Sequence, residues 1–71
     1  MTFLRWCQLQ GRRADGIGDF ARDWVADRDR PRAPTFGQMV EYLEDCGAIE
    51  EAIAAGERCY FQWRLYGAHV R

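Results

Sequence analysis

Apolar residues recur along this chain with the period of an α-helix in four successive segments. The clearest pattern lies in residues 16–28, where the large apolar side chains fall three or four positions apart: Ile17, Phe20, Ala21, Trp24 and Val25. This spacing places them on one face of a helix and leaves the charged side chains toward water. A helix with one apolar face is not stable alone, so we expect it to pack against the other apolar segments.

The first two predicted helices have recognisable start signals. Residues 2–10 predict the first helix with Thr2 as its cap, and Asp15 is placed to cap the second. Beyond the second helix the chain carries Pro31 and Pro34, each of which disfavours helix in the residue before it. We therefore expect an extended loop between the second and third helices.

The third helix is predicted over residues 35–46. Thr35 and Gln38 are spaced as a capping box at its start, and Gly47 is placed to end it. The last segment, 49–67, keeps one apolar face, although a glycine at position 56 weakens a continuous helix by about 1 kcal/mol relative to alanine. The pattern leaves open whether this glycine marks a kink, a close contact between helices or a break.

The whole pattern predicts an all-α fold, a compact bundle of four to five short helices in a single domain that spans residues 1–71. A chain of this length buries only about 60% of the surface that its unfolded form exposes. The three Trp, three Tyr and four Phe residues supply large buried area per residue and compensate for the small size.

The sequence offers no arrangement typical of catalysis or of a metal site, and we predict neither an enzyme nor a cofactor. His69 is the one histidine and lies close to the end of the chain, where chains fray, so we expect it at the surface. Cys7, Cys46 and Cys59 are widely spaced and fit neither a disulfide framework nor a zinc pattern. We expect all three to be small buried residues.

Aromatic residues and helix-start residues follow a characteristic order along the chain: Phe3 and Trp6, then Ile17-Gly18-Asp19-Phe20-Ala21 with Asp27, then Tyr42-Leu43-Glu44, then Trp63 with Leu65-Tyr66. In this order the chain resembles the YozE SAM-like family of small bacterial proteins over nearly its whole length. The resemblance implies a sterile-alpha-motif-like helical bundle. It implies no activity, because the family has no catalytic motif to carry over. The chain departs from the family in a longer segment 45–56 and in an arginine-rich loop between helices.

Charge is distributed unevenly, although the whole chain carries only −1. Residues 33–57 contain six acidic residues and no arginine, and they map to the outer face of the third helix and the start of the fourth. Such a surface attracts a basic partner, with ordinary solubility as the alternative explanation. Five aromatic residues exceed what so small a core can hold at its centre: Trp6, Tyr60, Phe61, Trp63 and Tyr66. Any of them at the surface beside Arg64 would form a second contact surface, with filling of the core as the alternative explanation. The candidate protein-binding residues are Glu41, Glu44, Asp45, Glu50, Glu51 and Arg64.

Arginine supplies all ten basic side chains. Five of them form two groups at opposite ends of the second helix, about 18 Å apart, and aspartates interleave the second group. Phosphate binding needs clustered positive charge, so this arrangement disfavours nucleic acid as a partner. The candidate nucleic-acid-binding residues are Arg12, Arg13, Arg28, Arg30 and Arg32, with Asp27 directly before the last three and Asp29 between Arg28 and Arg30.

We therefore predict a non-catalytic helical module that binds another protein and is itself a monomer or a weak homo-oligomer. The alternative is a phage-encoded or mobile-element-encoded inhibitor, anti-CRISPR-like, whose acidic surface occupies a basic surface of a host nucleoprotein or defence complex. Nucleic-acid binding through the arginines is the third hypothesis. No stretch reaches the ~18 apolar residues of a membrane span, and the start lacks the pattern of a secretion signal. We expect a cytoplasmic protein without a membrane partner.

Overall fold

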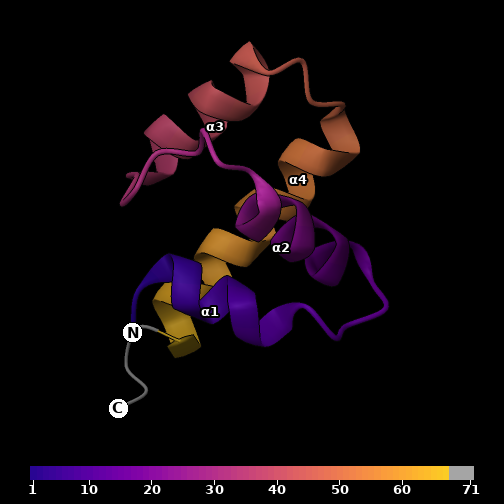
Figure 1. Cartoon of the computed structure of the whole chain (residues 1–71), viewed down its shortest axis with the longest axis vertical. Helices are drawn as coiled ribbons and strands as arrows, with labels where there is room; N and C mark the ends of the chain where they lie inside the picture. The colour runs from indigo at the N-terminus through magenta and orange to yellow at the C-terminus, as the bar shows by residue number, and fades with distance from the viewer. Residues whose placement is uncertain (68–71) are drawn as a thin grey trace.

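The computed structural model describes residues 1–67, which contain four α-helices and no strand (Figure 1). The helices are α1 (Phe3–Gln10), α2 (Gly16–Ala26), α3 (Phe36–Asp45) and α4 (Glu50–Gln62), and α4 continues as a π-helical turn, η1 (Trp63–Gly67). The prediction of an all-α bundle is confirmed. The second helix ends at Ala26 rather than near residue 28, so Arg28 belongs to the loop that follows. The predicted surface position of His69 lies outside the described residues.

Local start and stop signals form as the sequence predicts. The side chains of Thr2 and Asp15 each accept a backbone N–H from the first turn of the following helix. Thr35 and Gln38 make both hydrogen bonds of the capping box at the start of α3. Gly47 follows the end of α3 with a φ of 75°, a left-handed conformation that suits glycine because it has no side chain.

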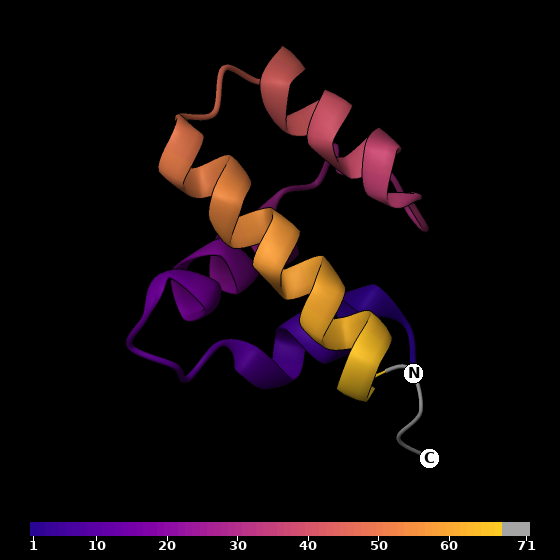
Figure 2. The same cartoon turned by 180° about the vertical axis from the view of Figure 1, so that it is seen from behind.

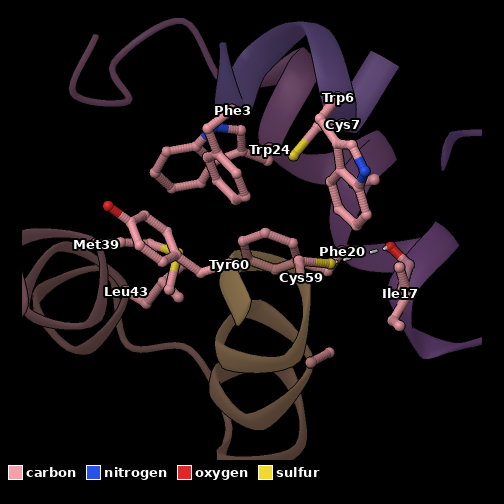
Figure 3. Close-up of a cluster of buried hydrophobic side chains, with 12 residues drawn as sticks. Phe3, Trp6, Cys7, Ile17, Phe20, Trp24, Met39, Leu43, Cys59 and Tyr60 are labelled. Atoms are coloured by element: carbon pink, nitrogen blue, oxygen red, sulfur yellow. Dashed lines mark hydrogen bonds between the residues drawn. The ribbon is translucent and has the colours of Figure 1, made fainter. Parts of the chain in front are cut away.

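The helix α4 contacts both α2 and α3, while α1 packs against α2 and η1 (Figure 2). Side chains from all four helices meet in one core (Figure 3). The Phe3 ring lies near its centre, with its centroid 5.2 Å from that of Tyr60 and 5.8 Å from that of Trp24. The buried apolar residues are Phe3, Trp6, Cys7, Ile17, Phe20, Ala21, Trp24, Met39, Leu43, Ala55, Cys59 and Tyr60.

The absence of a side chain at Gly56 allows α4 to approach its neighbours closely. A Cβ atom at this position would lie 2.8 Å from Cε2 of Phe20 and 3.1 Å from Cδ1 of Leu43. The first distance is shorter than side chains tolerate without movement. Because α4 is continuous from Glu50 to Gln62, the glycine marks a close contact between helices and not a break.

We expect Gly56→Ala to destabilise the protein, although the same substitution in an open helix position stabilises it. The added methyl group would overpack the core against Phe20, and overpacking costs about 1–3 kcal/mol of the free energy of unfolding. Gly37→Ala in α3 is the matched control, because its Cβ would meet nothing within 4 Å. Urea denaturation should show a lower midpoint for Gly56→Ala only. Equal effects of the two substitutions would contradict the close contact.

Candidate binding surfaces

The outer side of α3 carries an acidic depression. Its lining includes Glu41 and Asp45, which lie one helical turn apart, together with Tyr42 and with Asp29 of the preceding loop. Neither of the two ion pairs within residues 1–67 involves these three carboxylates. We call Asp29, Glu41 and Asp45 the acidic surface. Arg32 also lines the depression and borders it on the side of the loop.

The other predicted protein-binding residues do not all join the acidic surface. Glu44 is exposed on α3. Glu50 and Glu51 lie in the first turn of α4, where no side chain caps the helix, so their negative charge stabilises the positive end of the helix dipole. Arg64 lies near the opposite end of α4, about 20 Å from Glu51 at 1.5 Å per residue. Glu41 and Asp45 line the same depression, and Arg64 is not part of its lining.

Arg64 belongs instead to an apolar depression between α3 and the end of α4. Phe36, Phe61 and Leu65 line it together with the edge of Tyr60. The rings of Phe36 and Phe61 lie 5.2 Å apart between centroids. Phe61 is 57% exposed and Leu65 is 64% exposed, so both present their apolar side chains to solvent. We call Phe36, Phe61, Arg64 and Leu65 the aromatic surface.

The surplus aromatic residues differ in burial, and Tyr66 is 68% exposed without lining this depression. Trp6 and Tyr60 are buried, and the Tyr60 hydroxyl donates a hydrogen bond to the carbonyl oxygen of Pro34 at 3.0 Å. Trp63 is half-buried, and its indole N–H donates to the carbonyl oxygen of Met1 at 2.9 Å. The sequence indicated that not all of these aromatic residues can lie at the centre of the core. It could not identify Phe61 as an exposed one, because its exposure depends on how α3 packs against α4.

The loop between α2 and α3 is held at its start by hydrogen bonds. The Tyr42 hydroxyl donates to the carboxylate of Asp27, which also accepts the backbone N–H of Asp29. These two donors hold the pKa of Asp27 below its ordinary value, and the Tyr42 hydroxyl is the larger cause. The Arg30 guanidinium donates to the carbonyl oxygens of Val25 and Asp27, which satisfies carbonyl groups at the end of α2.

The five candidate arginines occupy three different environments. Arg13 pairs with Asp15 at 2.7 Å and also donates to the side chain of Gln62, so it links the turn to α4. Arg12 is exposed. Arg28, Arg30 and Arg32 line one depression together with Thr2 and Leu4 of α1. Asp29, which separates two of these arginines in the sequence, lines the acidic depression instead. Arg32 lines both depressions, and the expectation that this arginine group does not bind nucleic acid stays a prediction.

The three cysteines are free and differ in burial. Cys7 and Cys59 are buried, as expected, and burial is the main cause that raises the pKa of each thiol to about 12. Cys46 is exposed, which corrects the expectation that all three are buried, because it is the residue that ends α3. Within residues 1–67 no group of three or more His, Cys, Asp or Glu side chains is arranged to hold a metal ion.

No family model matches this chain, and neither a curated protein nor a solved structure matches it. The resemblance to the YozE SAM-like family stays a prediction. None of the helices in residues 1–67 has the length and apolar character needed to cross a membrane.

We predict that Tyr42→Phe raises the pKa of Asp27 toward the ordinary value of about 3.9. The variant keeps the ring that packs against Trp24 and removes only the hydroxyl donor. Because the folded-state pKa is lowered, this bond stabilises the fold above the unfolded-state pKa, and the stabilisation is lost as the pH falls through the folded-state pKa. The variant should therefore lose less stability on acidification.

A carboxyl NMR titration of both proteins measures this shift directly. Asp15 is the internal control, since its pKa is lowered by the backbone N–H of Gly18 and by Arg13, which the substitution does not touch. An unchanged Asp27 pKa, or an equal shift at Asp15, would rule out the proposed role of the Tyr42 hydroxyl.

We also predict that a thiol reagent modifies only Cys46 in the folded protein. The thiolate is the reactive form, and the raised pKa and burial of Cys7 and Cys59 suppress it at neutral pH. Mass spectrometry of the native protein should show one adduct, and the unfolded protein should show all three. Rapid modification of Cys7 or Cys59 under native conditions would contradict the described packing.

Proposed function

We propose that this chain is a non-catalytic module that binds another protein through the aromatic surface. The observation that carries the proposal is the joint exposure of Phe61 and Leu65 beside Phe36 and Arg64. Single exposed apolar residues are common, but a group of them in one depression marks an interaction site. Aromatic and arginine side chains are also the types that contribute most to protein–protein binding.

The chemistry of the aromatic surface specifies the partner segment. An apolar side chain of the partner would fill the depression between Phe36 and Phe61, and a carboxylate beside it would pair with Arg64. The module would act in the cytoplasm, where its free thiols remain reduced. A monomer or a weak homo-oligomer fits this proposal, with the aromatic surface available to the partner.

The acidic surface supports a second candidate function. Glu41 and Asp45 project from one side of α3, and Asp29 adds a third carboxylate to the same depression. A protein with this surface could occupy the nucleic-acid-binding surface of a host nucleoprotein or defence complex, as an inhibitor from a phage or mobile element would. The carboxylates would then stand in for phosphate groups.

We expect the double variant Phe61→Ser/Leu65→Ser to lose its partner while it keeps its fold. Leu65 is largely exposed, so its replacement should change the free energy of unfolding by no more than about 0.5 kcal/mol. Loss of the ring pair of Phe61 with Phe36 should cost about 0.5–1.5 kcal/mol, which leaves the core untouched. Loss of two central contacts should weaken binding by about tenfold or more. The measurement is affinity capture from nuclease-treated lysate of the native host, quantified by mass spectrometry and repeated with purified partner.

Two further variants separate the candidate functions. Leu9→Ser is the matched control, because Leu9 is 52% exposed on α1 and lies outside the aromatic surface. Glu41→Lys/Asp45→Lys tests the acidic surface and leaves the aromatic surface unchanged. Retention of the partner by the Phe61/Leu65 variant would refute the first proposal, and selective loss by the Glu41/Asp45 variant would favour the second. A partner captured only without nuclease would contradict both.

A further inference from the structure

Three arginine residues line one depression next to the start of α1. Arg28, Arg30 and Arg32 line it, and the remaining lining comes from Thr2 and Leu4. The residues alternate in the sequence with Asp29, which lines the acidic depression elsewhere. The segment 28–32 forms a turn at Arg28 and Asp29 and bends at Arg30 and Arg32. This irregular path places Arg28 and Arg30 in this depression and Asp29 in the acidic depression, while Arg32 lines both.

The charge of this depression is only partly balanced by the residues around it. Asp27 lies close enough to Arg30 for the arginine to lower its pKa, but its carboxylate is occupied by Tyr42 and by the N–H of Asp29. Neither of the two ion pairs within residues 1–67 involves Arg28, Arg30 or Arg32. Three like charges in one depression repel each other, and an anion that binds between them removes this repulsion.

The three arginines also differ in how firmly they are held. Arg30 is fixed by its two bonds to the carbonyl oxygens of Val25 and Asp27, so its position is set before a ligand arrives. Arg28 is exposed, and Arg32 is exposed on the border with the acidic surface. One anchored guanidinium with two adjustable ones is suited to enclose a compact anion, because each guanidinium offers a fork of N–H donors.

We propose that Arg28, Arg30 and Arg32 form a binding site for a phosphate monoester group. A monoester carries a charge of about −1.5 to −2 near neutral pH, so it gains more from three guanidinium groups than a carboxylate or a phosphodiester with a single charge. The shared chemistry is the terminal phosphate, and its source is a free nucleotide or the 5′ end of a nucleic acid. This site lies apart from the aromatic surface and does not depend on the proposed protein partner.

The first experiment titrates the full ¹⁵N-labelled chain with inorganic phosphate, against sodium chloride at equal ionic strength. We expect phosphate-specific shifts at the Thr2 and Leu4 amides and at the arginine side-chain N–H groups that line the depression. The second compares a nucleoside 5′-monophosphate with two short single-stranded oligonucleotides of one sequence, one with a 5′-phosphate and one with a 5′-hydroxyl. The phosphorylated probes should bind about tenfold or more tightly than the 5′-hydroxyl probe.

Matched variants locate the site. Arg28→Gln/Arg32→Gln should reduce phosphate affinity by about tenfold or more, and it leaves the anchoring bonds of Arg30 intact. Arg5→Gln/Arg58→Gln removes the same charge from exposed positions outside the depression and should change affinity by no more than about threefold. Urea denaturation checks that both variants keep the stability of the original chain.

The outcomes are distinct. Tighter binding of the phosphorylated oligonucleotide than of the monophosphate assigns the site to nucleic-acid ends, and equal binding assigns it to free monoesters. Equal binding of the 5′-phosphate and 5′-hydroxyl oligonucleotides would overturn the proposal, because it would indicate general attraction to the backbone. Three further results would overturn it as well. They are equal losses of phosphate affinity in the two double variants, tighter binding of a phosphate-free acidic peptide than of the phosphorylated probes, and identical NMR shifts with phosphate and with chloride.

Discussion

The close approach of α4 to its neighbours through Gly56 is the constraint on which the rest of the structure depends. With no Cβ at this position, the side chains of Phe20 and Leu43 lie directly against the backbone of α4. The later part of α4 is thereby placed so that Tyr60 contacts Phe3 and reaches the carbonyl oxygen of Pro34. The absence of a Cβ atom at Gly56 thus allows α2 and α3 to pack directly against α4. It also sets where the end of α4 meets the start of α3, which is where the aromatic surface forms.

The loop between α2 and α3 obeys a second constraint, which is electrostatic. Five of its consecutive positions, 28–32, carry three arginines and one aspartate. The turn and bends of this loop place Arg28 and Arg30 in one depression and Asp29 in another, while Arg32 lines both. The start of the loop is fixed by the bond from Tyr42 to Asp27 and by the bonds of Arg30 to the end of α2. Repulsion among the arginines is offset by these hydrogen bonds, so the charge cluster is compatible with a stable fold.

Local features of the fold were predictable from the sequence, and features that depend on tertiary packing were not. The caps at Thr2, Asp15 and Thr35 follow from residue types within four positions, and the apolar face of α2 follows from its period. The sequence could not show that Tyr42 reaches Asp27 or that Phe36 packs against Phe61, because these pairs are far apart in the chain. For the same reason it could not show that Arg28, Arg30 and Arg32 line one depression while Asp29 lines another. Function and family stay predictions, because neither follows from residue types within a few positions of each other in the sequence.

Arg32 shows why the surfaces of so small a protein cannot be treated as independent. It lines the arginine depression and also borders the acidic surface of Asp29, Glu41 and Asp45. Both depressions therefore lie within about one Debye length (~8 Å) of the same guanidinium at physiological ionic strength. An anion held beside Arg32 would neutralise the one positive charge in the acidic depression and strengthen the negative potential there. Conversely, a basic partner on the acidic surface would strengthen the positive potential around the arginines, so binding at each depression would favour binding at the other.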